Sequence, residues 1–585
     1  MGLRHTRLGE TLSYVLVILW LVSAGVARPG TLIGGGVDLY GTMWFFDWIR
    51  ECVSTGQNPG FTDQMFFPFG KDIFAHTGGN FVDALLSVPL QHLFGYPDFY
   101  PWFVVLLLGA NVASFRLLVG GLVKHRVVAW LSSILWLTNP FVLGELQGGR
   151  PTQALLCFMP LAVYFFLRCG ERWQAAILAG LCTALQAWTY WFSGWFMAFI
   201  FVVIAVQKIC RGTLNLPRHL VHWSMAGVTC LALVSPAWMA MASKVQAGLV
   251  PGVGITDLGA LHGWRPFAEK GTALFGTTSW ILLGLVTMLM RPSRSLWGLV
   301  LLGSMLLAFG PTSDGFLLWQ SVYQAVVGAV PFLERLWFPY RWLSVSFFAV
   351  CIGTALVLDT LVARTSRWAS WAAALVALAL VEQAMAGRAP LRAQQVNVPV
   401  VYQAMGHQQG GIIEIPFAVI RESLLWQPLH KQPLFGGMGE NAPAFWPPGF
   451  RHRMEDPFVR FLRGATHPGA TAQPVDESAL KDIQSKGFRF VVLDADALMR
   501  KVAKSPWWAE NHMKRGQVAE ESVSTLVSAL GEPAAVDGPL VVWDLQGEGF
   551  ESAELQPPNR PFVGQPWTGL PWSAYEKELE LYRME

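Results

Sequence analysis

Two aspartates near the start of the chain have the placement of a catalytic base. Asp38 follows three glycines soon after the first long apolar run, and Asp47 lies nine residues further on. A carboxylate close to a membrane surface can accept the proton of an attacking hydroxyl, and partial burial raises its pKa toward the range that this role needs. Asp38 could equally cap a helix over residues 39–51, and the two roles are compatible. Asp47 falls on the opposite face of that helix, where a solvated position is the alternative to a place in the site.

Further polar residues lie in two segments between apolar runs. Asp72 and His76 are four residues apart and could complete a site or bind a phosphate, although loop polarity explains them equally well. Asp257 and His262 form a sparser group, for which a donor or metal role is the functional interpretation. A divalent cation, Mg²⁺ or Mn²⁺, is the cofactor that such residues could bind, and the sequence leaves its presence open.

Arg335 and Arg341 are the candidates for binding a phosphate. A guanidinium forms two parallel hydrogen bonds with phosphate oxygens, and a charge at a membrane edge is costly without a partner. Either arginine could instead extend its head group to the interface, or pair with Glu334. Glu145 and Arg150 stand among three glycines, and we expect them to form a local ion pair.

Long apolar runs fill the first two-thirds of the chain. Hydrophobic residues make up 53% of the sequence and charged residues only 14%, whereas soluble domains average about 25% charged residues. The runs have the length of membrane-spanning helices. We predict about eleven spans, near residues 11–27, 100–122, 127–145, 152–168, 173–191, 192–207, 220–243, 273–290, 295–311, 339–359 and 368–386.

The short turns on one side of these spans are all basic. By the positive-inside rule, this pattern places the N-terminus in the cytoplasm, and an odd number of spans then places the C-terminal region outside. The first apolar run also resembles a secretory signal, and its cleavage would leave ten spans without changing the side of the next segment. The last 200 or so residues lack cysteine, which suits the inner membrane of a bacterium.

The sequence divides into a transmembrane domain, residues 1–386, and an extracytoplasmic soluble domain, residues 387–585. Segments 28–99, 244–272 and 312–338 of the first domain are too long to be turns, and we place them on the outer side. Within the first of these segments, residues 81–95 predict an interfacial helix.

The soluble domain alternates short apolar strands with helices, which is typical of an α/β or α+β fold. The predicted strands cover residues 410–416, 488–493 and 540–545, and the predicted helices cover residues 478–486 and 517–530.

Motifs for several other chemistries are absent from the sequence. There is no Walker loop, dinucleotide-binding glycine motif, HExxH or GxSxG, and none of the seven cysteines forms a CxxC pair. The chain also has no basic stripe or zinc-finger spacing, so that nucleic acid is not expected as a partner. The expected partner is the lipid bilayer.

The layout resembles the GT-C glycosyltransferases, membrane enzymes that take sugar from a polyprenyl-phosphate donor. In that superfamily the first outer segment carries an essential acid soon after the first span, a position that Asp38 matches. Bacterial relatives begin a late span with a Pro–Arg motif, matched by residues 338–341, and their outer domain carries a strand ending in Pro followed by a Gln–His–Pro string, matched by residues 414–416 and 427–433. Many members have adjacent acids in the first segment, whereas this chain has a single Asp38 with Asp47 further on.

The resemblance implies a polytopic α-helical membrane protein that is a glycosyltransferase. The donor would be a polyprenyl-phosphate sugar, and the acceptor a glycan, lipid or protein of the cell envelope. The alternative is a non-catalytic component, or a transporter, for the export of polysaccharide or lipid-linked glycan. A transporter should carry charges in mid-span, and these are scarce here, with Arg116 the clearest example.

Overall fold

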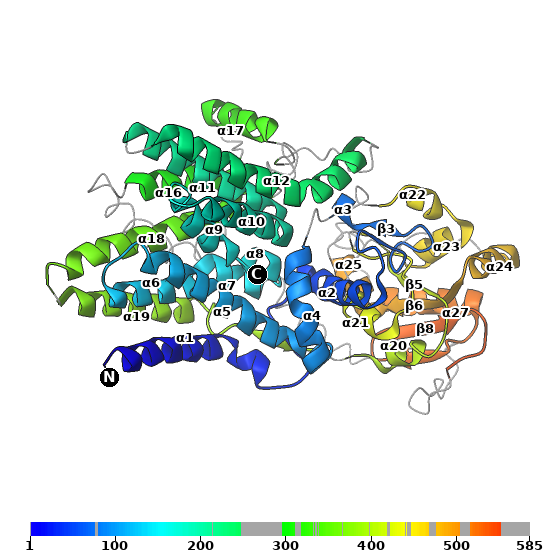
Figure 1. Cartoon of the computed structure of the whole chain (residues 1–585). Helices are drawn as coiled ribbons and strands as arrows, with labels where there is room; N and C mark the ends of the chain where they lie inside the picture. Colours follow the sequence, from blue (N-terminus) through cyan, green and yellow to red (C-terminus); the bar gives the residue numbers. More distant parts are fainter. Residues whose placement is uncertain are drawn as a thin grey trace. The chain divides into compact units, whose positions relative to one another are not determined.

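The protein chain folds into two compact units (Figure 1). Unit 1 comprises Met1–Thr42, Thr77–Ser243 and Gly252–Val396, and unit 2 comprises Met43–His76, Lys244–Pro251 and Asn397–Glu585. The computed structural model describes residues 2–76, 80–212, 215–246, 295–310, 317–330, 333, 336, 338–365, 367–396, 398–417, 422–438, 440, 446–466, 475–503 and 515–550. The division after residue 386 stays a prediction.

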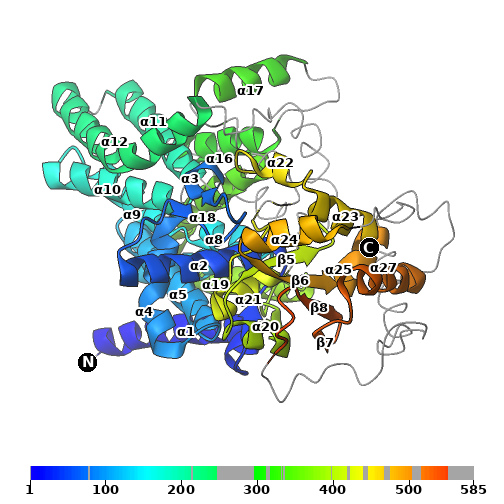
Figure 2. The ribbon, with the colours of Figure 1, turned by 90° about the vertical axis from the view of Figure 1, so that its right-hand side faces the viewer.

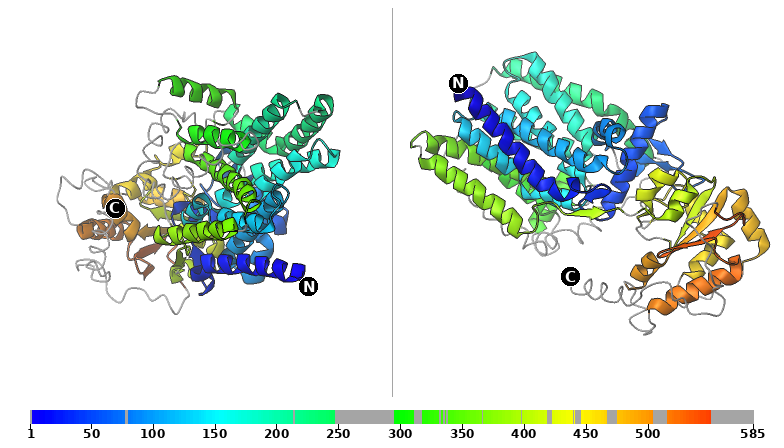
Figure 3. Two further views of the ribbon diagram at one scale, coloured as in Figure 1. Left: turned by 90° about the vertical axis from the view of Figure 1, so that its left-hand side faces the viewer. Right: turned by 90° about the horizontal axis from the view of Figure 1, so that it is seen from below.

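The described residues of unit 1 are helical apart from one short strand pair. Its helices are α1 (Gly2–Val26), the start of α2 (Val37–Thr55), α4 (Phe81–Phe94), α5 (Phe99–Gly120), α6 (Arg126–Leu137), α7 (Pro140–Gln147), α8 (Pro151–Ala154), α9 (Phe158–Leu167), α10 (Trp173–Thr189), α11 (Trp191–Cys210), α12 (Leu216–Gln246), α16 (Ser295–Ala308), α17 (Leu317–Ala329), the 3₁₀ turn η2 (Pro339–Trp342), α18 (Leu343–Val362) and α19 (Arg367–Met385). Seen from below in Figure 3, α1, in dark blue, runs along the other helices, and it packs against α5.

Seven stretches of helix among the described residues are long and apolar enough to cross a membrane. They are Leu8–Val26, Phe99–Gly120, Arg126–Gln147, Trp191–Cys210, Leu216–Ser243, Pro339–Val362 and Arg367–Met385. Each coincides with a predicted span, and the chain is therefore a multi-pass membrane protein. Three other predicted spans fall on shorter or less apolar helices, namely α8 with α9, α10 and α16. The last, near 273–290, lies outside the described residues.

The core of unit 1 lies where α5, α6 and α18 meet. The ring of Trp136 stacks on Phe115 with centroids 5.1 Å apart, and it meets Phe348 edge-on at 5.5 Å. Helix α6 ends where Asn139 caps the next helix, because the Asn139 side chain accepts from the Val142 N–H and Pro140 suits the first helical position. Helix α7 then ends at Gln147, with Gly148 as its C-cap, in the glycine turn before Arg150.

A two-stranded antiparallel sheet fixes the start of α2. Strand β1 (Thr31–Ile33), directly after α1, pairs with β4 (Ala393–Gln395), which follows α19. The chain then passes through Gly34–Gly36 into α2. The predicted helix over residues 39–51 is confirmed, but it begins at Val37, so that Asp38 lies in its first turn and not at the cap.

Unit 2 is built on a mixed four-stranded sheet in the order β5-β6-β8-β7 (Figure 2). Strands β5 (Gly411–Ile415) and β6 (Phe488–Asp494) are parallel, while β8 (Leu540–Asp544) is antiparallel both to β6 and to β7 (Ala535–Asp537). All of β5 and nearly all of β6 are buried, which explains why both read as continuous apolar runs. The three predicted strands are confirmed, and β7 was not predicted.

The helices of unit 2 include both that the sequence predicts, α24 (Glu477–Ser485) and α27 (Arg515–Leu530). The remaining elements among the described residues of unit 2 are the rest of α2, β2 (Phe61–Thr62), β3 (Lys71–Asp72), α3 (Ile73–His76), α20 (Val400–Met405), α21 (Ser423–His430), α22 (Phe450–Arg453), α23 (Pro457–Ala465) and α25 (Ala495–Ala503). In unit 1, the helix expected over residues 81–95 is α4.

Candidate functional site

Asp38 is an exposed carboxylate held against an arginine. It lies in the first turn of α2, where the helix dipole favours a negative charge, and 53% of its side chain is exposed. Its Oδ2 atom accepts a hydrogen bond from Arg150 Nη1 over 3.3 Å. The residue is thus both anchored and open to solvent.

A glycine turn brings Arg150 to Asp38. Gly149 has a φ of +70°, and a Cβ there would lie 2.5 Å from the Cβ of Leu39 and 2.8 Å from the carbonyl oxygen of Gly35. Only glycine therefore lets this turn approach the first turn of α2 so closely. The Gly35 N–H also donates to the Gln147 carbonyl over 3.0 Å, which fixes the two segments together.

Arg150 bridges two carboxylates. Its Nε atom donates to Glu145 Oε2, so the predicted local ion pair is confirmed. The side chain of Glu145 is only 3% exposed, whereas that of Arg150 is 20% exposed. Burial alone would lower the pKa of Arg150, but Glu145, Tyr340 and, least, Asp38 together outweigh it and the pKa is raised. Arg150 therefore stays charged.

Arg341 approaches the same group from η2, at the start of α18. Its Nη1 atom donates to the hydroxyl of Tyr190 over 2.5 Å, and its guanidinium lies 4.8 Å from the ring centroid of Phe338. Glu145 and Arg150 both act electrostatically on Arg341, which places them in its neighbourhood. The Nε atom of Arg341 is buried and has no hydrogen-bond partner among the described residues.

Together Asp38, Glu145, Arg150, Tyr190 and Arg341 form what we call the carboxylate–arginine cluster. The sequence singled out Asp38 and Arg341 separately, and it did not find Tyr190. The only signal for Tyr190 is its position at the turn between two apolar runs, which many tyrosines share.

The other predicted site residues fall elsewhere. Asp47 is buried in unit 2, where it pairs with Arg50 and Lys431, so it is neither solvated nor free to act as a base. Asp72 lies on β3 and is half-buried. His76 belongs to α3, and its side chain is not described, while Asp257, His262 and Arg335 lie outside the described residues.

Two basic residues of unit 2, Lys71 and His430, are buried and form hydrogen bonds within the protein. Burial lowers the pKa of Lys71 to about 7, and its amine donates to the Met438 carbonyl over 2.6 Å. His430 accepts from the Gln432 N–H through Nδ1 and stacks on Tyr402. Burial, together with Lys431, lowers the pKa of His430 to about 3, and it is therefore neutral at pH 7.

The described part of the chain offers no good set of ligands for a divalent cation. It contains no group of three or more His, Cys, Asp and Glu residues that could hold a metal ion. In the carboxylate–arginine cluster, Arg150 already binds both acids, and a cation there would have to displace the guanidinium. We therefore assign no catalytic step to a metal.

The fold is similar to that of GT-C glycosyltransferases of known structure, whereas no family model and no curated protein matches the sequence. The structure of arabinofuranosyltransferase AftD from Mycobacteria matches with a TM-score of 0.55 and 16% identity, over 84% of this chain and 37% of AftD. Two weaker matches are the Archaeoglobus fulgidus oligosaccharyltransferase (TM-score 0.49, 13% identity, 87% of this chain and 70% of that chain) and Cupriavidus metallidurans ArnT bound to undecaprenyl phosphate (0.46, 11%, 92% and 98%).

At these identities the likeness shows the fold alone. The chain spans little more than a third of the length of AftD.

Proposed function

We propose that the protein is a membrane glycosyltransferase that moves a sugar from a polyprenyl-phosphate donor to a hydroxyl of an envelope glycan, lipid or protein. The reaction would take place at the outer face of a bacterial inner membrane. The observation that carries this proposal is the carboxylate–arginine cluster, in which an exposed acid and a partly buried arginine with an unused donor occur in one group.

In the proposed reaction Asp38 is the general base. Its exposure lets an acceptor hydroxyl reach it, and it takes the hydroxyl proton as the oxygen attacks the anomeric carbon of the sugar. The bond between that carbon and the phosphate oxygen breaks, and the polyprenyl phosphate leaves with the electron pair. Arg341 binds the phosphate, because a guanidinium with an unused N–H can stabilise the charge that develops on the leaving group.

Arg150 and Glu145 position these two residues. Glu145 is buried and bound to Arg150, so its charge is already balanced and it is a poor base for an acceptor outside. Arg150 in turn holds Asp38 over 3.3 Å.

A feature of unit 1 disfavours the transporter alternative. Arg116, the clearest charge within a predicted span, pairs with Glu10 of α1 over 3.4 Å. Glu10 also binds Arg126. The three charges thus form an ion-pair group between α1 and its neighbours, whereas a transport pathway needs charges that face a cavity.

The test is Asp38→Asn, which keeps the size of the side chain but removes its charge and basicity. If Asp38 is the base, transfer from a polyprenyl-phosphate sugar should fall by about 10²–10⁴-fold, while thermal stability stays close to that of the wild type. The matched control is Asp63→Asn, an exposed acid of the same first outer segment, which should leave transfer unchanged. Full activity in Asp38→Asn would refute the proposed role and favour the non-catalytic alternative.

A further inference from the structure

Unit 2 carries an exposed surface that combines aromatic residues with arginines. The aromatic residues come from the segment of β2 and β3, where Phe61 is 48% exposed and Phe69 is 37% exposed. The arginines come from α22 and α23, where Arg451, Arg460 and Arg463 are all exposed. We call these five residues the aromatic–arginine surface.

Packing joins the two aromatic residues to α22. A Cβ at Gly70 would clash with the Phe61 ring, and a Cβ at Gly449, the residue before α22, would lie 2.8 Å from the Phe69 ring. The guanidinium of Arg453 in α22 lies 5.7 Å from the centroid of the same Phe69 ring. Figure 1 accordingly shows α22 beside α3 and β3. The aromatic and basic parts therefore form one continuous surface.

Helix α23 presents its arginines to solvent because its opposite face is buried. The helix begins where the Asp456 side chain accepts from the Phe458 N–H over 3.1 Å, and Pro457 suits the first helical position. Arg460 and Arg463 are three residues apart and thus lie together on the helix surface. The buried face consists of Phe458, Val459, Phe461 and Leu462.

The positive charge of this surface is only partly balanced within the protein. Arg463 lies 3.7 Å from Glu455, but both side chains are about half exposed or more, and such a pair contributes little. Arg451 and Arg460 form no ion pair with any described residue. Residues 450–466 contain four arginines and two acids, a formal charge of +2, whereas the whole chain carries +3. This concentration of charge attracts an anionic partner.

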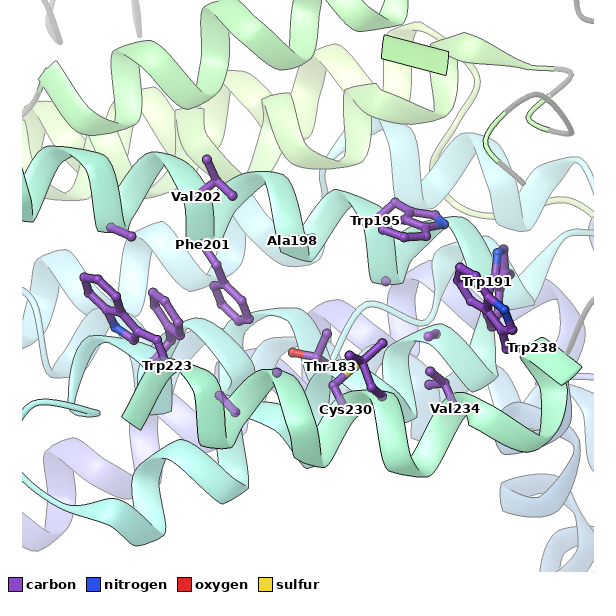
Figure 4. Close-up of a pocket in the computed structure, with 17 residues that line it drawn as sticks. Thr183, Trp191, Trp195, Ala198, Phe201, Val202, Trp223, Cys230, Val234 and Trp238 are labelled. Carbon is purple, nitrogen blue, oxygen red and sulfur yellow. The ribbon is translucent and has the colours of Figure 1, made fainter. Parts of the chain in front are cut away.

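The composition of this surface differs from that of an apolar pocket inside the membrane. The pocket between α11 and α12 of unit 1, with a volume of about 370 Å³, is rich in aromatic residues but has no charged residue among the described residues that line it (Figure 4). Such a lining belongs at the depth of the hydrocarbon. Aromatic rings next to arginines are instead typical of the interface between hydrocarbon and water.

The bilayer is an anionic surface to which unit 2 is tethered. Unit 1 contains the candidate membrane spans, and the chain passes from one unit to the other between residues 42 and 43, between 76 and 77, and between 396 and 397. The first two of these connections bound the segment that carries Phe61 and Phe69. The tether keeps unit 2 at a high effective concentration near the membrane, so that weak individual contacts are sufficient for docking.

We propose that the aromatic–arginine surface docks unit 2 on the bilayer, with the arginines on phospholipid phosphates and the rings of Phe61 and Phe69 in the interfacial layer. A guanidinium binds two phosphate oxygens at once, and an aromatic ring favours the level of the head groups. The inference does not depend on the proposed function, because it requires only that unit 1 spans the membrane.

Photo-crosslinking from position 69 tests the docking in the full chain. The protein is placed in nanodiscs of phosphatidylcholine, with or without an equal amount of phosphatidylglycerol, and a benzophenone analogue of phenylalanine replaces Phe69. Crosslinks to lipid should form mainly in the anionic discs. The matched control carries the analogue at Ser528, an exposed residue of α27, which Figures 1 and 2 both show apart from α22. From this position crosslinks to lipid should be absent.

Loss of two arginines should weaken the docking. Each arginine near an anionic membrane contributes a factor of about five, so Arg451→Gln with Arg460→Gln should lower crosslinking in the anionic discs by about thirtyfold. The matched control, Lys481→Gln with Arg500→Gln, removes the same charge from exposed positions of α24 and α25, and it should leave crosslinking unchanged. The thermal midpoints of both double variants should equal that of the wild type. A rise in salt should weaken crosslinking as well, because the charges are exposed.

Equal crosslinking in the two kinds of nanodisc, or crosslinking that survives the loss of Arg451 and Arg460, would overturn the inference. The same holds if position 69 gives no lipid crosslink in either disc. Crosslinks from position 69 to an added anionic polysaccharide, with none to lipid, would also overturn it, since the surface would then bind a glycan and not the membrane.

Discussion

Arg150→Met should unfold the protein more easily, and Glu145→Gln should rescue it. Glu145 is almost fully buried, and Arg150 is bound to it through Nε. Replacing the arginine by an apolar side chain of similar length leaves the Glu145 carboxylate as an unbalanced buried charge. In the double variant that buried charge is also gone, because glutamine and methionine are both neutral.

The expected loss of unfolding free energy in Arg150→Met follows from how exposed the paired side chains are. Breaking a buried ion pair from one side costs about 3–5 kcal/mol. Because Arg341 also acts on Glu145 and Arg150 is 20% exposed, we expect the lower end, about 3 kcal/mol. The contact of Arg150 with Asp38 adds little, since Asp38 is 53% exposed and exposed pairs contribute about 0.2–1 kcal/mol. The double variant should lie within about 1 kcal/mol of the wild type.

The assay is a double-mutant cycle on the free energy of unfolding, measured by titration with a denaturing detergent in mixed micelles. Asp38→Asn serves as the control for the exposed side of Arg150, and it should change stability by less than about 1 kcal/mol. A double variant as unstable as Arg150→Met would show that the cost arises from lost packing and not from the buried charge. That result would refute the assignment of Arg150 as the charge partner of Glu145.

Three further predictions concern binding, pH and orientation. Arg341→Lys keeps the charge but loses the planar fork, so the affinity for undecaprenyl phosphate, measured by a thermal shift, should fall while the ligand-free midpoint is retained. Lys71 has a folded pKa of about 7, below the unfolded value of about 10.4; the unfolded state binds more protons between these values, so stability rises with pH in this window. The gain in thermal midpoint of Lys71→Met over the wild type should accordingly shrink from pH 7 to pH 10. A reporter that is active only in the cytoplasm should be silent when fused after Glu585, and strong activity would reverse the proposed orientation.

The parts of the fold that the sequence predicts are those with a strong local signal. Strands β5, β6 and β8 are apolar runs bounded by turns, and seven of the predicted spans are long and uniformly apolar. Strand β7 has three residues and is half-buried, which is too short a pattern to detect. Helix α10 carries the buried Gln186, whose amide donates to the Leu155 carbonyl over 2.9 Å. Gln186 lowers the mean hydropathy of α10, although its side chain is hydrogen-bonded inside the protein.

The candidate site was predictable only in its separate members. Asp38 was singled out by its place after the first span, and Arg341 by its place at the edge of a late one. Their association depends on contacts between distant parts of the chain, since 112 residues separate Asp38 from Arg150 and 151 residues separate Tyr190 from Arg341. One local signal does exist, because the glycine pair before Arg150 marks a close approach of backbone. It does not identify the segment that approaches.

The charge balance of the cluster argues for the division of roles between its two acids. Asp38 and Glu145 together cancel Arg150 and Arg341, so the cluster has no formal net charge before a donor binds. A phosphodiester brings one negative charge, and the place with an unused donor is Arg341 Nε. Asp38 has the longer contact to Arg150 and the greater exposure, so it is held less tightly than Glu145, and its carboxylate is the one that an acceptor hydroxyl can reach.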